Sequence, residues 1–97
     1  MHSQTNSLET MDKITQLMVI TMEECGELVQ VCSKVLRKRA TQGKVPAETL
    51  DKLEAEAADV MCMIELMKEN KLIFEDGIEA GIERKRNKLK TWSDLVE

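Results

Sequence analysis

Apolar residues recur at helical spacing along the first part of the chain, from Leu8 to about Arg39. Residues three, four and seven positions apart share one face of a helix, and the apolar residues that follow this spacing are Ile14, Leu17, Met18, Leu28, Val31, Val35 and Leu36. The pattern predicts one long helix, or two helices joined end to end. Residues 1–7 are polar, so we expect a flexible N-terminus with Asn6 or Ser7 as the N-cap.

A second helix is predicted after a loop at residues 40–45. Gly43 is suited to ending a helix, and Pro46 is suited to the first turn of the next one. We expect that helix to run from about residue 47 to residue 69. Its segment 60–64 is apolar on all sides, which is typical of a helix at the centre of a bundle.

A third helix is predicted from Phe74 to about Lys90, after a short break at residues 70–71. Two glycines one turn apart would let a neighbouring element come close, and these are Gly77 and Gly81. The fold class is therefore all-α. We expect a single domain over residues 8–92, followed by a C-terminal tail over residues 93–97.

Size and charge limit what such a domain can do. A chain of 97 residues buries only a modest part of its surface by itself, so we expect a homodimer or homotetramer whose subunits share a core. The formal net charge of −4 argues against a protein that binds nucleic acid over its whole surface.

Cysteine usage points to a reducing compartment. Cys25, Cys32 and Cys62 lack C-x-x-C spacing, and His2 is the single histidine, so structural zinc is not expected. On apolar helical faces they are predicted to be buried free thiols. The sequence shows no signal peptide or membrane-spanning run, so we expect a soluble cytoplasmic protein with no membrane partner.

The most informative residues are acids on the first two helices. Glu23, Glu24 and Glu27 lie on the first helix, and Glu56 and Asp59 on the second. Thirteen residues of the chain are Glu, so spacing alone carries little weight. Position says more, because Glu24 and Glu27 each lie seven residues after one apolar position and four before another. We expect them, and the second pair, to point inward.

Four inward carboxylates would repel one another and lose hydration unless they protonate or bind a cation. Oxygen ligands suit Mg²⁺, with Mn²⁺ as the alternative, and carboxylates at i and i+3 can reach one ion. The other interpretation is that these acids are solvated or paired with Lys and Arg. A di-iron site would normally include Glu-x-x-His, and the predicted helices contain no histidine.

Basic residues crowd the end of the third helix, where Arg84, Lys85, Arg86, Lys88 and Lys90 surround Asn87. Such a cluster favours phosphate, although a solvated helical face is the plainer interpretation. RNA binding is less favoured, because Phe74 and Trp92 are the only aromatic residues and we expect Trp92 to pack. A second basic set ends the first helix, and we assign it to a solvated face: Lys34, Arg37, Lys38 and Arg39.

Taken together, E-E-x-x-E, a gap of 28 residues and E-x-x-D resemble the signature of MazG-like nucleotide pyrophosphohydrolases. The resemblance extends from about Leu8 to Lys90. It implies a helical bundle of the all-α NTP pyrophosphatase type, completed by pairing of subunits. It also implies that Mg²⁺ is bound by Glu24, Glu27, Glu56 and Asp59.

The same resemblance implies phosphate contacts from the third helix. Arg86, Asn87 and Lys90 fit the family pattern, with Lys85 beside them, whereas Glu83 stands where a further Lys is expected. The implied activity is Mg²⁺-dependent cleavage of a nucleoside triphosphate to a monophosphate and pyrophosphate. Glu23 is the predicted catalytic residue, a general base that accepts a proton from water, and its alternative roles are to bind metal or to orient water. The alternatives are a phosphoribosyl-ATP pyrophosphohydrolase and a non-catalytic helical interaction module.

Overall fold

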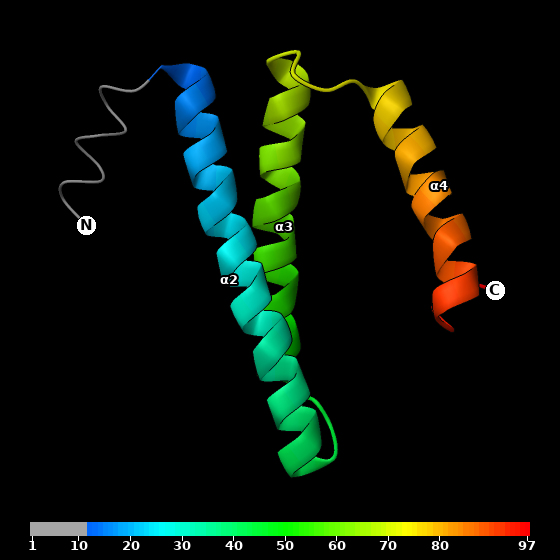
Figure 1. The fold of residues 1–97 in the computed structure, drawn as a ribbon. Helices are drawn as coiled ribbons and strands as arrows, with labels where there is room; N and C mark the ends of the chain where they lie inside the picture. Colours follow the sequence, from blue (N-terminus) through cyan, green and yellow to red (C-terminus); the bar gives the residue numbers. More distant parts are fainter. Residues whose placement is uncertain (1–11) are drawn as a thin grey trace, which may run out of the picture. The chain divides into compact units, whose positions relative to one another are not determined.

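A computed structural model describes residues 12–97, which form three helices, α2 (Lys13–Gln42), α3 (Ala47–Glu69) and α4 (Glu75–Trp92), without any strand (Figure 1). The predicted all-α class is confirmed for this part of the chain. The predicted flexible N-terminus, its N-cap and a helix start at Leu8 all lie outside the described residues. The described residues form two compact units that meet at Leu66 and Met67.

Helix α2 is one continuous helix of 30 residues with a defined cap at each end. Asp12 is its N-cap and accepts a hydrogen bond from the backbone N–H of Thr15 at 2.8 Å. Gly43 ends it in the left-handed region, with φ of 75°, and donates its N–H to the carbonyl of Arg39. Only glycine adopts this conformation without a Cβ penalty, which explains why the chain turns there.

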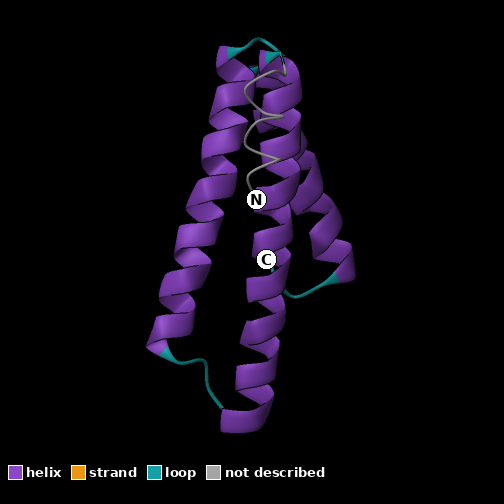
Figure 2. Cartoon of the chain, turned by 90° about the vertical axis from the view of Figure 1, so that its left-hand side faces the viewer, coloured by secondary structure: helices purple, strands orange, loops and turns teal. Residues whose placement is uncertain are grey.

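Helix α3 has the bounds that the sequence predicted. The carbonyl of Pro46 accepts hydrogen bonds from the N–H groups of Thr49 and Leu50, at 3.0 and 3.2 Å. Because the loop between α2 and α3 is short, the two helices run side by side in opposite directions, as Figures 1 and 2 show.

The α2–α3 hairpin is held by a seam in which buried positions repeat every seven residues on both helices. The well-buried side chains are Leu17 and Val31 on α2, and Thr49 and Met63 on α3. In an antiparallel pair, Leu17 lies at the level of Met63 and Val31 at the level of Thr49. Thr49 is 2% exposed, and its hydroxyl has no hydrogen-bond partner.

The second unit contains the end of α3, a turn and α4. Lys71 ends α3 with a positive φ of 60°, and the N–H of Leu72 reaches back to the carbonyl of Met67 at 3.0 Å. Lys68 and Glu75 form an ion pair of 2.8 Å across this turn. No side chain caps the N-terminus of α4, but Glu75 and Asp76 place negative charge in its first turn, where the helix dipole favours it.

Three expectations about packing were wrong for the chain by itself. The apolar segment of α3 is not enclosed, since Met61 is 66% exposed and only Met63 is buried there. The three cysteines are free but exposed. Trp92 is 76% exposed, so it does not pack into a core. For the α3 segment and the cysteines, the physical reason is that a hairpin of two helices covers one stripe on each helix and leaves the rest open.

The close approach expected at the two glycines of α4 is also absent within the described part of the chain. A Cβ at Gly77 would meet no atom within 4 Å, and one at Gly81 would meet only the side chain of Arg84, at 3.5 Å. Among the described helices, none has both the length and the apolar character needed to cross a bilayer.

The unpaired hydroxyl of Thr49 gives a test of the seam. Replacing Thr49 by Val keeps the shape and removes a buried group without a partner, so the free energy of unfolding should rise by about 1 kcal/mol. Thr49→Ser keeps the hydroxyl and loses the methyl group, so it should lower that free energy. Urea denaturation at one fixed protein concentration measures both variants, and equal effects would show that Thr49 is not in a dry seam.

Candidate metal centre

Three carboxylates meet at the middle of the α2–α3 seam. Glu24 extends from α2, and Glu56 and Asp59 extend from α3; one oxygen of each lies within 4.8 Å of the others. The i, i+3 spacing of Glu56 and Asp59 places both on one side of α3, as the sequence predicted. All three residues belong to the same compact unit.

The positions of Glu24 and Glu56 follow from the seam itself. Glu24 lies midway between the buried Leu17 and Val31, seven residues from each, and Glu56 lies midway between Thr49 and Met63 in the same way. The two acids therefore occupy the layer of the seam where two apolar side chains would be expected to meet. Both are partly buried, whereas Asp59 is exposed at the edge of the cluster, so the expectation that Asp59 points inward was wrong.

The electrostatic consequence is visible at Glu24. Its pKa is raised from the ordinary value of 4.5, first by loss of hydration and then by the negative charges of Asp59 and Glu56. Glu27 and Glu23 add smaller contributions in the same direction. None of the three clustered carboxylates forms an ion pair with a Lys or Arg among the described residues. Pairing with a basic side chain, one form of the plainer interpretation, is therefore not what is seen.

The donor set fits a hard divalent cation. All ligand atoms are carboxylate oxygens, which suit Mg²⁺ and Mn²⁺ and not Zn²⁺. With an Mg–O distance of about 2.1 Å, oxygens on opposite sides of the ion lie about 4.2 Å apart, so small side-chain rotations would bring the three oxygens into range. Three protein ligands would leave further positions for water or substrate.

Two predicted acids do not join the cluster. Glu27 and Glu23 are exposed, and neither contributes an oxygen to the set of three. The expectation that Glu27 points inward was wrong. The covered stripe of α2 follows a seven-residue repeat through Leu17, Glu24 and Val31, and Glu27 lies at the border of this stripe. Glu27 instead lines a groove next to the cluster.

The predicted phosphate-binding residues of α4 are exposed and divided between different surroundings. Lys85 places its Nζ 5.8 Å from the ring centroid of Trp92, a cation–π arrangement that sequence reasoning missed. Arg86, Asn87 and Lys90 line one hollow of about 370 Å³ beside the C-terminal tail. That hollow also has carboxylates in its lining, from Glu79, Glu83 and Glu97.

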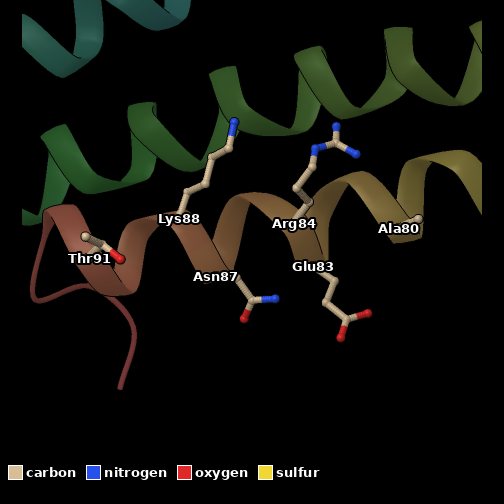
Figure 3. A pocket seen from close by; sticks show the side chains of 6 residues that line it. All are labelled: Ala80, Glu83, Arg84, Asn87, Lys88 and Thr91. Carbon is tan, nitrogen blue, oxygen red and sulfur yellow. The ribbon is translucent and has the colours of Figure 1, made fainter.

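A second hollow of about 550 Å³ lies along α4 and is lined by Ala80, Glu83, Arg84, Asn87, Lys88 and Thr91 (Figure 3). Arg84 and Lys88 extend to one side of the helix, while Glu83 and Asn87 extend to another (Figure 3). The helix therefore offers basic groups on more than one face, with acids between them.

The raised pKa of Glu24 predicts how metal-free protein responds to acid. Because the folded-state pKa lies above 4.5, the folded protein binds more protons than the unfolded chain in that range, and stability should fall as pH rises from about 4.5 through the folded pKa. Glu24→Gln removes this group, so the fall should be smaller in that variant. Thermal unfolding in chelator across this pH range measures it, with Glu54→Gln, an acid outside the cluster, as control.

No protein-family model, curated protein or solved structure matches the chain. The acidic cluster, the basic helix and the sequence motifs that supply them are therefore the features that support a function.

Proposed function

We propose that this chain is a Mg²⁺-dependent nucleoside triphosphate pyrophosphohydrolase, which converts a nucleoside triphosphate to a monophosphate and pyrophosphate. The observation that carries the proposal is the convergence of Glu24, Glu56 and Asp59 halfway along the α2–α3 seam, where none of them has a basic partner among the described residues. The carboxylates repel one another and Glu24 has lost part of its hydration, and a bound divalent cation would relieve both effects. The MazG-like acid motifs supply the reaction class.

The acids in and next to the cluster would have different roles in the proposed reaction. Glu24, Glu56 and Asp59 would hold the ion, and a bound Mg²⁺ would supply Lewis-acid and water-activating chemistry. Glu23 lies next to Glu24 along α2 and is exposed, so it is our proposed acceptor for the proton of the attacking water. Glu27, one helical turn from Glu24, would be a fourth ligand or orient a water that fills an open position. Phosphate contacts from Lys85, Arg86, Asn87 and Lys90 remain a prediction from the resemblance.

A homo-oligomer is the second part of the proposal, and an exposed apolar stripe on α2 supports it. Its members alternate at spacings of four and three residues and are all exposed: Met18, Met22, Cys25, Val29, Cys32 and Leu36. This is the a/d repeat of a helix that pairs with another helix. The flanking e and g positions carry no charge, so a second copy of α2 would meet no repulsion along the seam.

The competing class is a non-catalytic helical interaction module, which the same exposed stripe also favours. A test for pyrophosphate release distinguishes the hydrolase from the interaction module, because a module would bind a partner and release no pyrophosphate. A phosphoribosyl-ATP pyrophosphohydrolase would use the same cluster, and competition between phosphoribosyl-ATP and a panel of nucleoside triphosphates distinguishes it.

Hydrolysis tests the cluster directly. Wild-type protein should release pyrophosphate from at least one nucleoside triphosphate in the presence of Mg²⁺ and none in chelator. Glu24→Ala and Asp59→Ala should each lower the rate by at least about 100-fold, since each removes a ligand from the ion. Pyrophosphate release across a nucleotide panel is the measurement.

The matched control is Glu54→Ala, which removes an exposed acid of α3 outside the cluster and should leave the rate unchanged. Binding of Mn²⁺, followed by electron paramagnetic resonance, gives a readout that does not depend on the substrate. Full activity in both cluster variants would show that other residues hold the metal.

Self-association is tested by placing charge in the apolar stripe. Val29 is 67% exposed in the single chain, so Val29→Glu should not disturb the hairpin but should dissociate the oligomer. Val29→Leu keeps the position apolar and should leave the assembly intact. Light scattering after size-exclusion chromatography measures the mass, and a wild-type monomer at all concentrations would reject the pairing.

A further inference from the structure

A groove between α2 and α3 lies beside the acidic cluster, in the same compact unit. It has a volume of about 250 Å³ and is lined by Glu27, Gln30, Val31, Lys34, Arg37 and Lys52. Three of these six side chains are cationic and one is anionic, so the groove is locally positive in a chain whose net charge is −4. Part of the basic set that we assigned to a solvated face therefore lines a concave surface.

The groove begins one helical turn from the cluster. Glu27 follows Glu24 by three residues on α2, and Lys52 precedes Glu56 by four residues on α3. Because the helices are antiparallel, both steps lead toward the loop at Gly43, and each covers only about 5 Å along the helix axis. The groove thus begins next to the acidic cluster and extends along the hairpin toward the α2–α3 loop.

The basic side chains of the groove are available to a ligand. Lys34, Arg37 and Lys52 form no ion pair among the described residues, although acids lie one or two turns away. Lys34 is partly buried, which favours binding of a counter-charge over free hydration. On α2 the Cα–Cβ bonds tilt toward the N-terminus, and therefore toward the cluster.

We propose that this groove is a phosphate subsite of the proposed pyrophosphohydrolase, in addition to the α4 contacts that the resemblance implies, and the assignment rests on that function. The phosphate groups beyond the α-phosphate would extend from the cluster toward the loop, with Lys34, Arg37 and Lys52 contacting their oxygens. Gln30 offers an amide N–H as a hydrogen-bond donor, and Glu27 lies at the end of the groove nearest to the acidic cluster. The chemistry recognised is a chain of phosphate groups, which a nucleoside triphosphate and inorganic pyrophosphate share.

The chain offers a matched pair of double variants. Arg37→Gln with Lys52→Gln removes two charges from the groove, whereas Arg39→Gln with Lys44→Gln removes two charges from α2 and its loop outside the groove. Net charge changes equally, so any general electrostatic effect is the same in both proteins. Circular dichroism verifies folding, and the single changes Lys52→Gln and Lys52→Arg carry the test if the groove double variant does not fold.

Isothermal titration with inorganic tripolyphosphate and with pyrophosphate, in excess Mg²⁺, measures the subsite. The groove double variant should bind both about tenfold more weakly than wild type, while the control double variant should change by less than about twofold. The KM for the nucleoside triphosphate should rise to a similar extent. Affinity for Mn²⁺ alone should stay within about twofold in both variants, because the three cluster acids are intact.

The outcomes separate the subsite from the function. If wild type neither binds Mn²⁺ nor hydrolyses any nucleotide, the proposed function fails, and tripolyphosphate binding without metal still tests the groove. If wild type is active but the two double variants bind phosphate chains equally well, the subsite assignment is overturned. The assignment is equally overturned if the groove double variant loses affinity for an unphosphorylated nucleoside to the same degree.

Discussion

The structure of the hairpin depends on one constraint, which is that two glutamates occupy the central layer of its buried seam. Leu17 and Met63 are the buried residues seven positions from Glu24 and Glu56 on one side, and Val31 and Thr49 are those on the other, so the seam itself positions the two acids. An apolar pair at this level would hold the helices more simply. Loss of hydration, followed by the negative charges of Asp59 and Glu56, raises the pKa of Glu24, which is the strain that our proposed cation would relieve.

The same constraint limits what the single chain can bury. Only Leu17, Val31 and Met63 are buried apolar residues in the described part, while many large apolar side chains remain exposed. Burying a side chain of this size contributes about 1.5–3 kcal/mol, so three of them do little against the conformational entropy of two long helices. An a/d stripe on α2 supplies the missing apolar contacts if a second copy pairs there. The incomplete core of the single chain is therefore the reason for proposing a homo-oligomer.

The sequence predicted helix boundaries well where local chemistry sets them. Gly43 and Pro46 fix the loop through φ preference and a missing N–H, and α3 has the predicted bounds. Glu24 and Glu56 were identified because a seven-residue repeat includes them in the buried stripe. Glu27 and the cysteines were misplaced because periodicity tells which residues share a face, and only a partner helix decides which face is covered.

Opposite charges are arranged in sequence along the hairpin instead of neutralising each other. The acids of the cluster and the bases of the groove lie about one helical turn apart, close enough to act on one ligand, yet they form no ion pair with each other. Direct pairing of Lys52 with Glu56 would satisfy both groups and leave nothing to attract a cation or a phosphate. Leaving both unpaired stabilises the protein less, and it would suit the metal ion and the phosphate chain that we propose as ligands.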